Sequence, residues 1–77
     1  MKIRLNTIEK VKKFISAATF IDGDLVIESG KYVVDGKSIM GILSLDLNKD
    51  LTLKIFENVE GEAEKLIDKL NELELLA

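Results

Sequence analysis

The spacing of the apolar residues switches several times along this chain, and these switches restrict its fold more than any other feature. Apolar residues two apart predict a strand with one buried face, whereas apolar residues three and four apart predict an amphipathic helix. Residues 51–56 show the clearest alternation, and residues 63–73 show the clearest helical stripe. The expected elements, in chain order, are a strand at 1–5, a helix at 7–18, strands at 25–27 and 31–35, a helix at 38–47, a strand at 51–56 and a helix at 62–73.

Short strands and helices in this order favour an α+β sandwich, in which three helices cover one face of a four-stranded, mostly antiparallel sheet. A chain of 77 residues is expected to form one domain over residues 1–77. It contains neither cysteine nor histidine, which excludes disulfides and the usual zinc sites. The core must therefore come from Leu, Ile, Val and Phe, within the 47% of residues that are hydrophobic.

The charge and the aromatic content argue against two kinds of binding surface. A net charge of -3 with one tyrosine and three phenylalanines does not supply the clustered cations and stacking aromatics of a nucleic-acid surface. No apolar run reaches the roughly 20 residues that cross a bilayer, and the alternating start of the chain is unlike a signal peptide. We therefore expect a cytoplasmic protein with no nucleic-acid partner and no membrane partner.

Two polar residues stand where helices are expected to begin. Asn6 precedes the first helix and has Glu9 three residues later, an arrangement close to a capping box, so we expect Asn6 to cap this helix. We expect Ser38 to cap the second helix in the same way. Gly41 is expected to weaken that helix by about 1 kcal/mol relative to alanine.

No arrangement of residues indicates an enzyme. The chain has no phosphate-binding loop, no dinucleotide fingerprint and no nucleophile with a candidate base nearby. The aspartates at 22, 24, 46 and 50 do not have the spacing of a calcium loop. We therefore expect no catalytic activity, no metal site and no cofactor.

The segment Lys37-Ser38-Ile39-Met40-Gly41, followed by Leu43-Ser44-Leu45, resembles the serine-bearing second helix of HPr, the histidine-containing phosphocarrier family of the bacterial phosphotransferase system. The resemblance is strongest to HPr proteins of Gram-positive bacteria, and the expected order of elements is also that of the HPr fold. It therefore implies an HPr-like open-faced sandwich. It also implies that Ser38 matches the serine that a dedicated kinase and phosphatase modify in those bacteria.

The catalytic motif of the HPr family, which reads Gly-Leu-His, a small residue and Arg-Pro, is not present. Counting back from Phe20, which resembles the family's aromatic residue after the first helix, places Asn6 at the histidine. An asparagine carboxamide is neither nucleophilic nor basic near neutral pH, so it cannot carry phosphate as a histidine does. The family's glycine, arginine and proline are replaced, in that order, by Arg4, Ile8 and Glu9.

A chain that keeps this serine but lacks the histidine resembles the catabolite-repression HPr-like branch of the family. Proteins of that branch serve in regulation as corepressors. The resemblance implies a noncatalytic regulatory or protein-interaction domain that is controlled by phosphorylation of Ser38. Its implied partner-binding residues are Lys37, Ile39 and Met40. Its implied partner is a protein, such as an HPr kinase or a transcriptional regulator.

The residues alone leave two alternatives open. A ferredoxin-like α+β domain that binds a small molecule or a protein, without phosphorylation, has the same order of elements through the fourth strand. In that domain Ser38 would be only a helix cap. The two folds differ in strand order, which the sequence does not determine. Ile39 and Met40 could also lie in the core instead of on a partner surface, because methionine suits either place.

Overall fold

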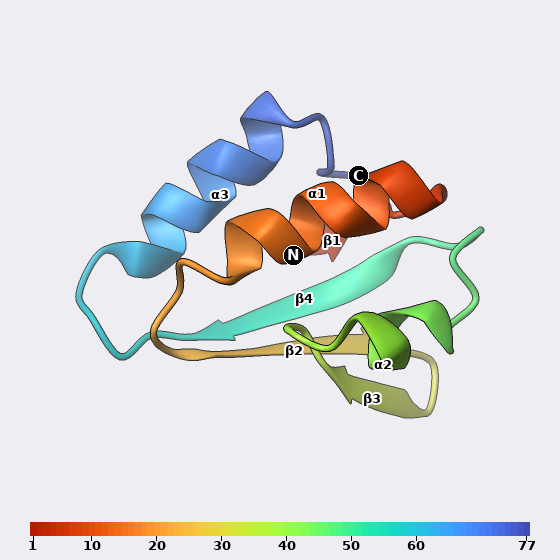
Figure 1. The fold of residues 1–77 in the computed structure, drawn as a ribbon. Helices are drawn as coiled ribbons and strands as arrows, with labels where there is room; N and C mark the ends of the chain where they lie inside the picture. The colour runs from red at the N-terminus through yellow and green to blue at the C-terminus, as the bar shows by residue number, and fades with distance from the viewer.

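The computed structural model describes residues 1–77 and has the expected order of elements (Figure 1). The α+β class is confirmed, because four strands form one antiparallel sheet that is combined with three helices. The elements are β1 (Lys2–Ile3), α1 (Ile8–Ala18), β2 (Asp24–Ser29), β3 (Tyr32–Asp35), α2 (Ile39–Leu43), β4 (Leu51–Phe56) and α3 (Glu62–Glu72).

The strand order of the sheet is β1-β4-β2-β3, and each neighbouring pair is antiparallel. β1 lies at one edge of the sheet, and β4 is its neighbouring strand. β2 and β3 form a hairpin, and its turn contains Gly30 at a φ of 58°. This order is that of the HPr-like open-faced sandwich. It excludes the ferredoxin-like alternative, in which the first strand lies inside the sheet.

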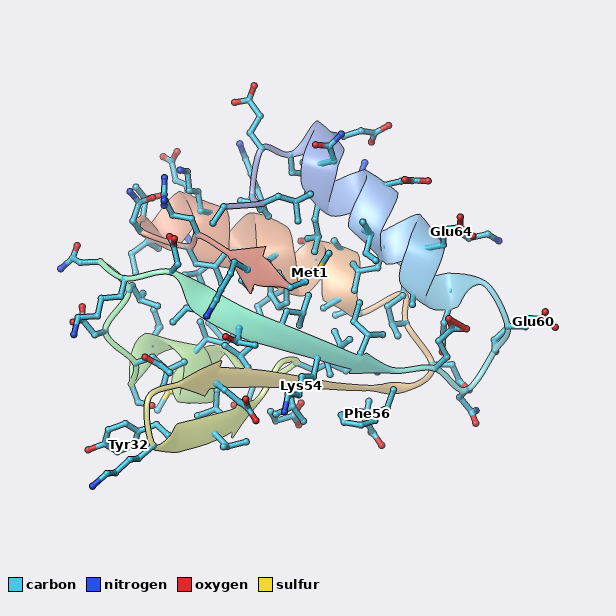
Figure 2. All side chains as sticks on the ribbon, turned by 180° about the vertical axis from the view of Figure 1, so that it is seen from behind. Met1, Tyr32, Lys54, Phe56, Glu60 and Glu64 are labelled. Carbon is cyan, nitrogen blue, oxygen red and sulfur yellow. The ribbon has the colours of Figure 1, made fainter.

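The core lies between the helices and one face of the sheet. Phe14 of α1, Ile42 of α2 and Leu70 of α3 are fully buried in one apolar cluster with the inward residues of β2 and β4. The other face of the sheet is uncovered, and Figure 2 shows it in front of the helices with Lys54 and Phe56 pointing away from them. The alternation of each strand therefore separates a buried face from an open one.

The cap of α1 is Thr7, not Asn6. Thr7 has an extended backbone, with φ -137° and ψ 156°, and its side-chain oxygen accepts a hydrogen bond from the Lys10 N–H at 3.1 Å. Its carbonyl accepts from the Val11 N–H, also at 3.1 Å. Because the helix begins at Ile8, the capping position is one residue later than expected, and Asn6 lies too early to reach the free N–H groups. The prediction that Asn6 caps this helix is wrong.

The second helix is also shorter than predicted, because α2 ends at Leu43. Beyond it, the Asp46 Oδ1 accepts a hydrogen bond from the Asn48 N–H at 3.1 Å. An aspartate that binds the backbone two residues later favours a turn over a continued helix. The apolar residues of segment 44–47 still pack on the core, since Leu45 is buried, but they do so without helical structure.

Glu62 is a buried carboxylate at the start of α3, with 8% of its surface exposed, and it joins two loops. The hydrogen bond from the Asn58 N–H contributes most to lowering the pKa of Glu62 from 4.5 to about 2, while burial acts in the opposite direction. The loop between α1 and β2 is thereby tied to the loop between β4 and α3. The donors are the backbone N–H groups of Asp22 at 2.8 Å, Gly23 at 3.0 Å, Asn58 at 2.7 Å and Val59 at 3.1 Å.

The C-terminal residues cover the free edge of β1. The chain reverses after α3 at Glu74, which has a left-handed backbone with a φ of 58°. The Arg4 N–H then donates to the Leu75 carbonyl at 2.8 Å, and the Ala77 N–H donates to the Lys2 carbonyl at 3.0 Å. These bonds satisfy backbone groups that an edge strand otherwise leaves free.

Candidate functional site

Ser38 precedes α2 and caps it, as the sequence predicts. Its backbone is extended, with φ -100° and ψ 111°, and its Oγ accepts a hydrogen bond from the Gly41 N–H at 3.1 Å. The Ser38 carbonyl accepts the first intrahelical bond, from the Ile42 N–H at 3.0 Å. Both oxygens of Ser38 therefore start the helix, and the residue is half-buried.

Gly41 lets α2 lie close to β3. A Cβ at this position would stand 3.2 Å from the Cβ of Val34 and 3.4 Å from the Ser38 Oγ. Interiors at normal packing density have little room for such an addition, so a larger residue would displace α2 or disturb its cap. The glycine that weakens the isolated helix therefore serves its packing.

Three apolar side chains of α2 remain exposed, and we call them the α2 patch: Ile39, Met40 and Leu43. Their exposed fractions are 39%, 78% and 41%, whereas Ile42 on the same helix is 0% exposed. Residues three and four apart share one side of a helix, so Leu43 extends the surface that Ile39 and Met40 begin. The alternative in which Met40 lies in the core is wrong. Leu43 was not predicted to belong to this surface, although its spacing from Ile39 and Met40 on a helix indicates that it does.

Lys37 forms two hydrogen bonds within the protein. Its ammonium group donates to the backbone carbonyl of Ile21, which follows α1, and its N–H donates to the Asp35 Oδ1 at 2.9 Å. The bond to Ile21 ties the turn before α2 to the segment after α1, and the bond to Asp35 lies within the turn itself. A partner that used the Lys37 ammonium would have to compete with the bond to Ile21.

Asn6 lies exposed at the start of α1, one residue before the cap. Its carboxamide cannot accept a phosphoryl group, because the amide nitrogen is neither nucleophilic nor basic. Ile8, which stands where the resemblance places an arginine, is 53% exposed and carries no charge.

No group of three or more histidine, cysteine, aspartate or glutamate side chains is arranged to hold a metal ion. No helix is both long enough and apolar enough to cross a membrane.

Met40→Ala is expected to change the free energy of unfolding by less than about 0.5 kcal/mol, because an exposed side chain loses little packing when it is shortened. Ile42→Ala is the matched control on the same helix, and it is expected to cost about 2–5 kcal/mol, as for other buried aliphatic residues. Urea denaturation measures both. A loss for Met40→Ala that equals the loss for Ile42→Ala would place Met40 in the core.

The comparisons with known proteins agree with this geometry. A protein-family model described as the PTS HPr component phosphorylation site matches residues 8–74. The chain is also similar to a crystal structure of Crh, the catabolite repression protein of Bacillus subtilis, which is described as an intertwined dimer with a swapped domain. The two chains are 29% identical, the match covers 100% of this chain and 90% of Crh, and the TM-score is 0.66. No curated protein sequence matches. Because the family model spans most of the sequence and the structural match spans all of it, this chain belongs to the HPr family of the phosphotransferase system.

Proposed function

We propose that this protein is a noncatalytic, regulatory member of the HPr family that is phosphorylated on Ser38 and acts by binding another protein through the α2 patch. One observation carries the proposal. The matched family model is described as a phosphorylation site, and this chain contains Ser38 at the start of α2 but no histidine.

The start of α1 supports the noncatalytic part of the proposal. Asn6, which the resemblance places at the family histidine, lies two residues before the first matched residue, Ile8. A phosphocarrier needs a nucleophilic nitrogen and a nearby cation for the incoming phosphoryl group, and neither Asn6 nor Ile8 provides them.

The surroundings of Ser38 support the regulatory part. A phosphate on its Oγ would add about -1.5 to -2 charges at neutral pH directly beside the α2 patch. The change would alter the surface that a partner meets while the core, which contains only Ile42 from this helix, stays the same. Phosphorylation would therefore act on partner affinity and leave the fold intact. A regulatory role is also in keeping with Crh, whose description places it in catabolite repression.

A second function follows from the cap itself. The bond from the Gly41 N–H to the Ser38 Oγ is a sufficient structural reason for a serine at this position. In that case the α2 patch binds its partner without any modification.

The kinase reaction distinguishes the two functions. An HPr kinase with ATP is expected to label the wild type, and Ser38→Ala is expected to abolish the label. Ser44→Ala is the matched control, because Ser44 lies at the other end of α2 and its Oγ donates to the Gly41 carbonyl at 2.6 Å. This variant should be labelled like the wild type. If several such kinases leave the wild type unmodified while Ser38→Ala only destabilises the helix, Ser38 is a structural cap.

A further inference from the structure

A groove of about 620 Å³ runs between α1 and α3, and none of the residues that line it belongs to the α2 patch. The two helices run antiparallel, so the C-terminal end of α1 lies beside the N-terminal end of α3 (Figure 1). The tied loops at Glu62 close this end of the groove. Nothing in the HPr-type phosphorylation proposed above uses this surface.

The floor of the groove is apolar. Ala17, Ile21 and Leu66 line it with side chains that are already buried in the protein. Phe20 and Val59, at the closed end, are 88% and 54% exposed although both are large and apolar. These two side chains would lose water contact if an apolar molecule lay in the groove, which favours its binding.

The sides of the groove are basic. Lys12 and Lys13 lie on α1, and Lys65 and Lys69 lie four residues apart on α3. Four of the eleven cationic residues of a chain with a net charge of -3 therefore surround one groove.

Few carboxylates oppose these lysines. The groove is lined by two carboxylates, and both are already hydrogen-bonded: Glu62 to four backbone N–H groups and Asp22 to the side-chain amide of Asn58. Among the lysines only Lys69 forms an ion pair, an exposed one with Glu72 at 3.5 Å. Because four lysines and two carboxylates line the groove, its lining carries a net positive charge.

We propose that this groove binds a small organic anion with an apolar body, such as a medium-chain carboxylate. The apolar part would lie on Ala17 and Leu66 and against Phe20, while the acid group would meet the lysines. A volume of about 620 Å³ lies within the range of about 300–1,000 Å³ that is typical of small-molecule sites. A stable protein partner would instead cover about 800 Å² of each protein, more than one groove between two short helices offers.

A fluorescence titration with anilinonaphthalene sulfonate, which joins an aromatic body to a sulfonate, tests the site on the folded chain. Saturable binding is expected, and decanoate should displace the probe whereas the uncharged decanol should displace it far less. Amide NMR shifts should map to α1 and α3. Raising the salt concentration should weaken binding, because exposed charges are screened.

Three variants distinguish binding in the groove from binding elsewhere on the surface. Lys12→Gln with Lys65→Gln should weaken binding about tenfold, because two exposed charge contacts are lost. Lys10→Gln with Lys54→Gln removes the same charge outside the groove and should leave binding within about twofold of the wild type. Ser16→Phe fills the groove from an exposed position on α1 and should abolish binding with every lysine in place.

The proposal is overturned if no saturable binding occurs, if both double variants weaken binding equally, or if Ser16→Phe has no effect. If poly-glutamate bound as tightly as decanoate, the lysines alone would account for binding. That result would also overturn the proposal, in which the apolar floor takes part in binding. Circular dichroism of each variant confirms that it remains folded.

Discussion

Gly23→Ala is expected to lower the free energy of unfolding by about 3 kcal/mol. A Cβ at position 23 would lie 2.1 Å from the carbonyl oxygen of Phe56 and 2.8 Å from the backbone nitrogen of Asn58. Both are main-chain atoms, which cannot rotate away as a side chain can. Relief of the overlap would separate the two loops and break the bond between the Gly23 N–H and Glu62. Urea denaturation measures the loss, and the m-value is expected to stay unchanged.

Gly30→Asn serves as the control for this glycine. No atom would lie within 4 Å of a Cβ at Gly30, and its φ of 58° is a conformation that asparagine tolerates. This substitution should change stability by less than about 0.5 kcal/mol. If Gly23→Ala were no more harmful than Gly30→Asn, the close approach of the loops would be disproved.

Glu62→Gln is expected to remove a pH-dependent part of the stability. The four N–H donors bind the charged carboxylate, and the pKa of Glu62 in the folded protein is lowered to about 2 from 4.5. Because the unfolded state binds a proton more readily than the folded state, the stabilisation is fully present above about pH 4.5 and is lost as the pH falls toward 2. A glutamine has no such titration.

The stability difference between the wild type and Glu62→Gln should therefore be largest near neutral pH and should shrink on acidification. Chemical denaturation at a series of pH values measures this difference. Glu64→Gln, at an exposed position in the same first turn of α3 that forms none of these four hydrogen bonds, is the control and should give a much smaller difference near neutral pH. Parallel curves for the wild type and Glu62→Gln would contradict the assigned role.

The element types and their order could be predicted because they depend on local spacing. The alternation of residues 51–56 and the helical stripe on α3 each need only one segment of chain to be recognised. Strand order could not be predicted in this way, because the pairing of β2 with β4 joins residues that are far apart in the sequence. The resemblance of the Ser38 segment to HPr favoured the HPr-like fold, but the strand order remained open until the structure showed it.

The role of Glu62 in joining two loops was not predicted either, because it also depends on residues that are far apart in the sequence. From the sequence, this glutamate is one of several acidic residues that favour the positive start of a helix. Its four donors come from two loops, and the donors at Asp22 and Gly23 are distant in sequence. The prediction that Asn6 caps α1 failed for a local reason. Asn6 and Thr7 are both good capping residues, and which of them caps the helix depends on where the helix begins.

The candidate site could be predicted only in part. Ser38 was expected to cap a helix, and it does. The exposure of Ile39 and Met40 depended on how α2 sits on the sheet, which a helix of five residues does not reveal by its pattern. Lys37 was expected to bind a partner, but its bond to the Ile21 carbonyl required knowledge of where α1 ends.

We propose that phosphate reaches this protein on Ser38 and not through the carrier chemistry of its family. The most direct test of this proposal is the intact mass of the protein, with the modified residue mapped, after two reactions. One reaction uses enzyme I with phosphoenolpyruvate, with a histidine-containing HPr as the positive control, and the other uses an HPr kinase with ATP. We expect no phosphate from phosphoenolpyruvate and one phosphate from ATP, on Ser38. An acid-labile phosphate transferred from phosphoenolpyruvate to this chain would contradict the proposal.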